Sequence, residues 1–450
     1  GHPAETTTVS DAAPPQTTAT STSTSTASDV ASPEEKPVEE KLGPRWTRPG
    51  FGFGGVPAIA YNPDAGFQFG VVGNIYDYDG KTAPYKNTVH LLILVSTKLV
   101  QHHALSLDSV NFLDLPVRLN AEVGYYENLG ENYCGIGPGV TCDDDTAKVA
   151  AAKEGVTDQT ALDAFLRHYY AIPYIEPYAQ ANVRLRLNDA TSPTKIEALV
   201  GWRGDDFIPG TIFDDNHDGK LDLFPYPGSL YARDFPGGEP GFLSVFQTGL
   251  VFDHRDNEPS PRRGWYAEGT LRGSHPYVGS AWTYAGADLN LRGYVPVIPG
   301  NDRLVLAMRF ILDGIVGTPP IVELANTAGT TNYSGYGGSD LGRGIRGQRY
   351  LGNVKLLEQQ ELRWHFYEFD VAGQEFGLIA NAFLDAGYVA PDFAHLDEPF
   401  RQTTQPVLPL GYGGAFLISW NQNFIVRLDV AVSPVEHDAI SPYITLGQSF

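Results

Sequence analysis

The fold is decided by stretches such as VRLNAEVGY, residues 117–125, in which apolar and polar side chains alternate at every position. Alternate side chains of a β-strand point to opposite faces, so one face of this stretch is apolar and the other carries Arg118 and Glu122. The stretch AQANVRLRL, residues 179–187, repeats the pattern. The same alternation returns in four further segments, at residues 285–292, 304–310, 362–366 and 424–432. The sequence therefore predicts an all-β fold.

Soluble β-sandwiches alternate in the same way, so three further features are needed to assign the strands to a membrane barrel. The polar faces carry charge in mid-strand, as suits a water-filled lumen. The apolar faces lack charge, because lipid contact costs about 2–4 kcal/mol per misplaced Lys or Arg. Aromatic residues recur near strand ends, as in an interfacial girdle. They are Tyr76, Tyr78, Tyr125, Tyr126, Trp364, Phe366 and Tyr443. The last candidate strand ends at Phe450, and outer-membrane barrels usually end in Phe.

About sixteen candidate strands follow one another, and an even number is expected when a single chain closes an antiparallel barrel. Their connections alternate between short and long, and long loops face the cell exterior. The longest connections are residues 128–167, 205–240, 314–354 and 389–410. We therefore predict a 16-stranded antiparallel transmembrane β-barrel over residues 51–450. It would lie in the outer membrane of a Gram-negative bacterium, in contact with lipid and lipopolysaccharide.

Composition excludes several other classes of protein. The chain carries 31 Lys and Arg against 53 Asp and Glu, a net charge of −22, which argues against binding to nucleic acid. The most apolar run, residues 89–95, is far shorter than a membrane-spanning helix. Residues 1–50 are rich in Ser, Thr and Pro and cannot bury a core, so we predict a disordered periplasmic segment there.

Two local motifs suggest chemistry in the long loops. Cys134 and Cys142 are close enough in sequence for a disulfide, which would persist in an oxidising compartment; two free thiols are the alternative. The stretch DDNHDGKLD, residues 214–222, resembles a calcium-binding loop, although Pro225 replaces the usual bidentate acid. The alternative is a solvated acidic loop. The candidate ligands are Asp214, Asn216, Asp218 and Asp222.

Motifs for catalysis and nucleotide binding are weak or absent. Residues 342–347 and 50–55 match the spacing GxGxxG, but neither lies in a strand-turn-helix unit, so we expect no nucleotide. No GxSxG, HExxH or Cys/His metal spacing occurs, and we do not expect an enzyme. A hydrolase whose Ser, His and Asp meet only in the folded chain is the remaining alternative.

The stretch GRGIRGQRY, residues 342–350, resembles the BamA/TamA-like superfamily of bacterial surface antigens, which are outer-membrane assembly and secretion barrels. That family has an R-G-F/Y signature in its long sixth extracellular loop. Arg346-Gly347 matches the signature, with the aromatic displaced to Tyr350. Further similar segments are residues 57–70, 253–266, 358–364 and 383–387. The family usually carries periplasmic POTRA domains before the barrel. Here only the segment predicted to be disordered precedes it, so the chain looks like a POTRA-less branch.

The resemblance implies that Arg346 turns back into the lumen and pairs with an acid on the inner wall. Asp385 of FLDAG is the first candidate and Glu361 of ELR the second. A bidentate carboxylate would match the planar guanidinium. Alternatively, Arg346 is a solvated loop residue and each acid pairs with a lumen arginine such as Arg363.

The resemblance also draws attention to the seam between the first and last strands, where relatives are thought to open laterally. Pro57 lies in the first strand and Pro442 near the start of the last, which ends at Phe450. Each proline removes a backbone donor, so pairing at this seam should be shorter than elsewhere; proline as a simple marker of strand ends is the alternative.

By resemblance, the expected function is insertion or translocation of polypeptide at the outer membrane. The chain would act alone or as an accessory subunit with a periplasmic or outer-membrane protein partner. The alternative is a structural or pore-forming barrel whose extracellular loops bind a partner. No cofactor other than calcium is expected.

Overall fold

The structure is a computed structural model, and its described part begins at residue 47. It describes residues 47–450 apart from 83, 139–141, 211–225, 227, 237–239, 332–334, 372–373, 398–407, 421–423 and 438. Most of the segment predicted to be disordered, residues 1–50, therefore lies outside the described residues.

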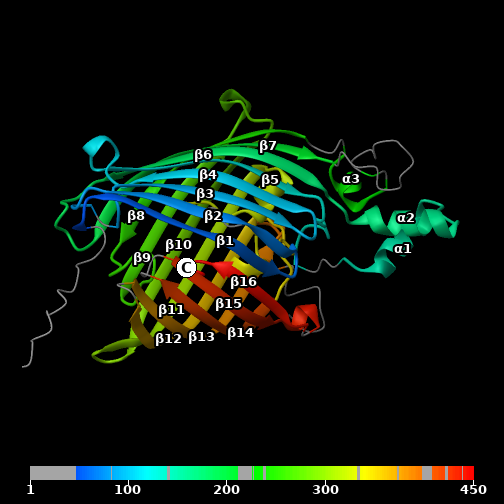
Figure 1. The fold of residues 1–450 in the computed structure, drawn as a ribbon. Helices are drawn as coiled ribbons and strands as arrows, with labels where there is room; N and C mark the ends of the chain where they lie inside the picture. The colour runs from blue at the N-terminus through cyan, green and yellow to red at the C-terminus, as the bar shows by residue number, and fades with distance from the viewer. Residues whose placement is uncertain are drawn as a thin grey trace, which may run out of the picture. The chain divides into compact units, whose positions relative to one another are not determined.

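Sixteen strands form one closed antiparallel barrel, which confirms the predicted fold (Figure 1). The first eight are β1 (Gly50–Asn62), β2 (Gly66–Tyr78), β3 (Asn87–Ser96), β4 (Val100–Ser109), β5 (Val117–Asn128), β6 (Tyr174–Arg186), β7 (Lys195–Pro209) and β8 (Gly241–Asp253). The others are β9 (Gly264–Ser274), β10 (Thr283–Ile298), β11 (Asn301–Thr318), β12 (Val354–Val371), β13 (Gln374–Ala390), β14 (Leu410–Trp420), β15 (Phe424–Val432) and β16 (Ser441–Leu446). Each strand pairs with its sequence neighbours, and β1 meets β16 to close the ring.

The strand faces divide as the alternation predicts. On β5, Val123 on the outer face is 55% exposed, as a lipid-facing side chain must be. On the opposite face, Arg118 donates hydrogen bonds to both oxygens of Asp108 on the inner face of β4 (2.8 and 2.6 Å). The polar faces of neighbouring strands thus line the lumen and satisfy one another's charges.

The outer face is not free of charge throughout. On β12, Leu357 and Gln359 are each 1% exposed and face the lumen, which places Glu358 and Gln360 on the outer face. The prediction of a charge-free outer face is therefore wrong at this strand.

Short helices lie in the long extracellular loops, although the sequence patterns predicted strands alone. They are α1 (Asp144–Lys153), α2 (Gln159–Tyr169), α3 (Leu230–Asp234), α4 (Ile321–Ala325) and α5 (Gly338–Leu341). Single-turn 3₁₀ helices cover Phe112–Asp114, Pro276–Val278 and Pro434–Glu436. No helix within the described residues is both long enough and apolar enough to cross a membrane.

The last strand is shorter than the sequence suggested. β16 ends at Leu446, and Gly447 follows with a φ of 88°, a left-handed conformation that glycine adopts without strain. Phe450 is 6% exposed and packs beside the ring of Tyr294 and below the guanidinium of Arg309. Since the inner faces of β10 and β11 carry these two residues, the tail turns into the lumen, and the prediction that the strand runs to Phe450 is wrong.

Candidate functional site: a loop anchored inside the barrel

Residues 319–353, which connect β11 to β12 and are here named loop six, fold back into the lumen. The backbone carbonyl of Asp340 in α5 accepts hydrogen bonds from Arg309 on β11 (2.6 Å) and Gln359 on β12 (3.0 Å). The carbonyl of Ser339 accepts one from Arg427 on β15 (2.8 Å). Side chains of the inner wall therefore hold the backbone of this loop.

Arg343 forms the most buried contact between loop six and the wall. Its side chain has no exposed surface, and its Nε and Nη2 donate to the two oxygens of Asp385 (2.9 and 2.8 Å). Its Nη1 donates to Glu361 (2.7 Å) and reaches Asp429 at 3.5 Å. The guanidinium carbon lies 3.6 Å from the centre of the Phe383 ring. Charge-assisted, bidentate bonds of this kind fix position as well as charge.

The strands place these partners by simple alternation. Asp385 on β13 lies in register with Gln359 of β12, and Glu361 follows on the same inner face. β14 separates β13 from β15, and its Gly411 lets the loop approach, because a Cβ there would lie 1.7 Å from the carbonyl oxygen of Arg343. Glycine at this position is therefore part of the anchor.

The anchoring arginine is Arg343, so the prediction that Arg346 pairs with Asp385 or Glu361 is wrong. Arg346 is exposed, and its backbone N–H donates to Glu436 (3.2 Å) in the loop between β15 and β16. Asp385 and Glu361, the two acids that the resemblance selected, do form ion pairs with an arginine of loop six, but it is Arg343. Loop six contains two Arg-Gly pairs, residues 343–344 and 346–347, and only the arginine of the first pair bonds to the acids of the inner wall.

Backbone geometry explains the choice between the two pairs. Gly344, which follows Arg343, has a φ of 89°, and a Cβ there would meet the backbone of Val432 at 2.8 Å. The glycine lets the chain turn against β15 while Arg343 points at Asp385. The glycine after Arg346, Gly347, has a different task, since its N–H donates to Asp64 (2.9 Å).

Loop six also contacts both sides of the barrel seam. The N–H of Gly344 donates to the hydroxyl of Tyr443 on β16 (2.9 Å), whereas Gly347 reaches Asp64 in the turn between β1 and β2. Burial raises the pKa of the Asp64 carboxyl, although the Gly347 hydrogen bond and the charge of Arg346 oppose the rise. The loop is therefore hydrogen-bonded to each of the two elements that close the ring.

Direct pairing at the seam itself is short. β1 and β16 are in register at one position, Tyr61 opposite Ile444, whereas β1 pairs with β2 along its whole length. Pro57 lies in β1 and Pro442 in β16, where prolines cannot donate to a neighbouring strand. Pairing at the seam is therefore shorter than between β1 and β2, as predicted.

A second anchor holds the first part of loop six. Glu323 of α4, 1% exposed, forms ion pairs with Arg203 on β7 and with Arg272 on β9 (3.4 Å). Lys355 on β12 donates to the carbonyl of Asn326 (2.8 Å). Nothing in the local sequence marked Glu323 as a site, because it lies in a short helix that no periodic pattern reveals.

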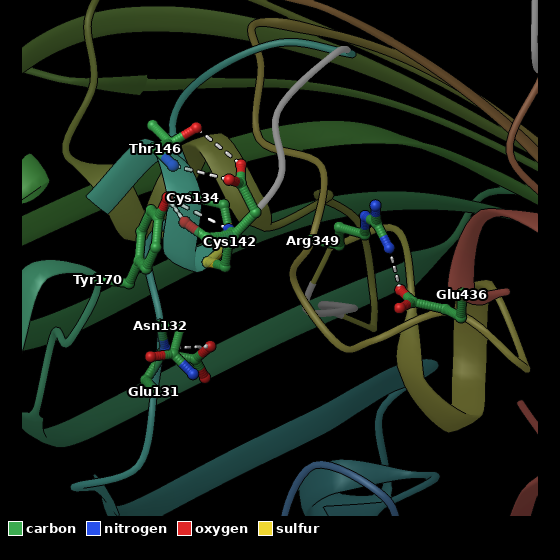
Figure 2. Close-up of a disulfide and its surroundings, with 9 residues drawn as sticks. Glu131, Asn132, Cys134, Cys142, Thr146, Tyr170, Arg349 and Glu436 are labelled. Carbon is green, nitrogen blue, oxygen red and sulfur yellow. Dashed lines mark hydrogen bonds and ion pairs between the residues drawn. A yellow bond between two sulfur atoms is a disulfide. The ribbon is translucent and has the colours of Figure 1, made fainter. Parts of the chain in front are cut away.

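The extracellular loops pack into a cap with its own core. Cys134 and Cys142 form the predicted disulfide, with their Cα atoms 4.9 Å apart, and Figure 2 shows it beside Tyr170. The Tyr170 hydroxyl donates to the carbonyl of Asp143 (2.9 Å), immediately before α1. Aromatic residues of the β5–β6 and β7–β8 connections, together with aliphatic residues of loop six, form this core. They include Tyr133, Phe165, Tyr169, Tyr231 and Phe235, with Ile321 of α4.

The proposed calcium ligands Asp214, Asn216, Asp218 and Asp222 lie outside the described residues, so calcium binding stays a prediction. Within the part of the chain that the structure describes, no group of three or more His, Cys, Asp or Glu is arranged to hold a metal ion.

Comparison with known proteins gives a family match and a likeness of fold. Residues 215–437 match the model of the Omp85 superfamily domain. CdiB from Escherichia coli is similar in structure, with a TM-score of 0.52 and 11% sequence identity. That alignment covers 87% of this chain and 62% of CdiB, so the chain spans less than two thirds of that relative. BamA from Haemophilus ducreyi lacking POTRA domains 1–3 aligns over 89% of this chain and 70% of its own, with 13% identity and a TM-score of 0.49. No curated protein matches the sequence.

Proposed function

Since the barrel of this chain belongs to the Omp85 superfamily and lies in the bacterial outer membrane, we propose that it assists the insertion or translocation of polypeptide there. It acts alone or as an accessory subunit of a larger complex. One observation supports the proposal above others: a seam with one register position is spanned by a loop that bonds to both of its sides.

The seam supplies the chemistry that a client polypeptide needs. Separation of β1 from β16 would break few interstrand bonds and expose two strand edges with unpaired N–H and C=O groups. Such an edge pairs readily with an extended segment of another chain. Loop six restrains this separation through Tyr443 and Asp64, and its anchor at Arg343 fixes the loop itself.

A disulfide across the seam should stop this activity. Tyr61 and Ile444 are Cα partners, so the double variant Tyr61→Cys/Ile444→Cys can be cross-linked there. We expect at least a roughly tenfold slower insertion of a urea-unfolded eight-stranded barrel into proteoliposomes, measured by protease protection, because a covalent bond keeps the two edges paired.

The matched control is Leu362→Cys/Ala382→Cys, which places the same bond between β12 and β13. Its insertion rate should stay within about twofold of the wild type, because these strands remain paired in the mechanism. Equal rates for the two cross-linked variants would remove the seam from the mechanism.

The extracellular cap supports a second candidate, a structural or pore-forming barrel that binds an exterior partner. Its disulfide and aromatic core make an ordered platform. In planar bilayers, however, a loop anchored in the lumen should keep the steady conductance low. A large, stable conductance together with no insertion activity would favour the pore.

A further inference from the structure

Glu358 and Gln360 form a polar pair on the outer wall of the barrel. Both side chains belong to the face of β12 that points away from the lumen, and the Nε2 of Gln360 donates to the Oε1 of Glu358 (2.6 Å). A carboxamide has two donor hydrogens and an acceptor oxygen. One donor and the oxygen of Gln360 thus remain for a further partner.

The pair lies between apolar rows of the outer wall. Strand register aligns Glu358 with Phe310 on β11 and Ala386 on β13. The outer-face residues in register on these three strands form rows. The next row toward the cell exterior contains Leu312, Leu356 and Tyr388. Beyond Gln360 toward the periplasm, the next two rows contain Leu306, Leu362 and Ala382, and then Leu304, Trp364 and Ala380. Apolar and interfacial aromatic side chains therefore flank the pair on both sides.

Polar groups at this depth are costly unless another protein covers them. Hydrocarbon offers no hydrogen bonds, so an unpaired amide or carboxyl keeps its full desolvation penalty. Polar side chains inside a membrane accordingly pair with one another across protein interfaces.

We propose that this face of β12 is an interface at which two copies of the chain associate in the membrane. A two-fold axis along the membrane normal brings residues of equal depth together. Each Gln360 then meets the Gln360 of the second copy, and the two carboxamides exchange two hydrogen bonds. Glu358 orients each amide by accepting its other hydrogen.

The surface around Gln360 combines large and small side chains. Met308 on β11 and Leu384 on β13 lie in register with Gln360, whereas the outer positions of β13 on either side of Leu384 carry the small residues Ala382 and Ala386, where the two walls can come close. Strands β13, β14 and β15 separate β12 from β16. The interface thus leaves the seam between β1 and β16 uncovered, and it does not depend on the proposed function.

Cysteine cross-linking in native outer membranes tests the interface. Gln360→Cys should form a disulfide-linked dimer under mild oxidation, because the two copies of position 360 meet at the two-fold axis. The described cysteines of the chain are already paired with each other and leave no other thiol to react. The control is Leu291→Cys on β10, which is 39% exposed on the outer face and lies in the same row as Phe310 and Glu358. It should give no dimer.

A second measurement follows the wild-type pair itself. Glu358→Leu/Gln360→Leu should weaken dimerisation in lipid nanodiscs by roughly tenfold, measured by mass photometry over a concentration series. Equal cross-linking of Gln360→Cys and Leu291→Cys, a monomeric wild type, or a cross-link from position 360 to a different protein would each overturn the proposal.

Discussion

Replacement of Arg343 by alanine should lower the free energy of unfolding of the barrel by about 3–5 kcal/mol, because it leaves a buried charge without its partner. Asp385 has no exposed surface, and both of its oxygens accept from the Arg343 guanidinium. Glu361 keeps Arg363 (2.7 Å) and is affected less. Urea unfolding in detergent micelles, followed by tryptophan fluorescence, measures the change.

The matched control is Arg346→Ala in the same loop. Arg346 is exposed, so its removal should change the free energy of unfolding by no more than about 0.5 kcal/mol. A double-mutant cycle with Asp385→Asn should show strong coupling to Arg343, since the second substitution removes the charge that the first leaves unpaired. Additive effects in this cycle, or a larger loss from Arg346→Ala, would contradict the assignment of the anchor.

The strands were predictable because their signal is local. Period-two alternation is imposed on each strand by lipid on one side and water on the other, so segments such as residues 117–125 reveal their own environment. The acids of the anchor were predictable for the same reason, since Asp385 and Glu361 stand at lumen positions of regular strands.

The arginine was not predictable, because its partner choice depends on tertiary packing. Arg343 and Arg346 are each followed by glycine, and they differ in which residues of the barrel they contact. Gly411 on β14 opens the space for Arg343, and no pattern near residue 343 reports a glycine almost seventy positions away. The turn of the C-terminal tail at Gly447 depends on lumen contacts in the same way.

Loop six also depends on its second anchor, and Glu323→Gln should lower the free energy of unfolding by about 3 kcal/mol at pH 7. Burial alone would raise the pKa of Glu323, but the charges of Arg203 and Arg272 lower it to about 2. The neutral amide has the same shape and removes only the charge. It leaves three cations, Arg203, Arg272 and Lys355, with one acid fewer to share.

The sign of the pH dependence follows from the depressed pKa of Glu323. Its contribution to stability is complete above the unfolded value near 4.5 and is lost as the pH falls toward 2, since the unfolded chain then binds the proton first. The difference between wild type and Glu323→Gln should therefore shrink to less than half between pH 7 and pH 3. The control Glu154→Gln, at an exposed acid just after α1, should differ little from the wild type at either pH. A Glu323→Gln deficit that stays constant with pH would show that the substitution acts through packing, and the ion pairs of α4 would then not be what holds this part of loop six to the wall.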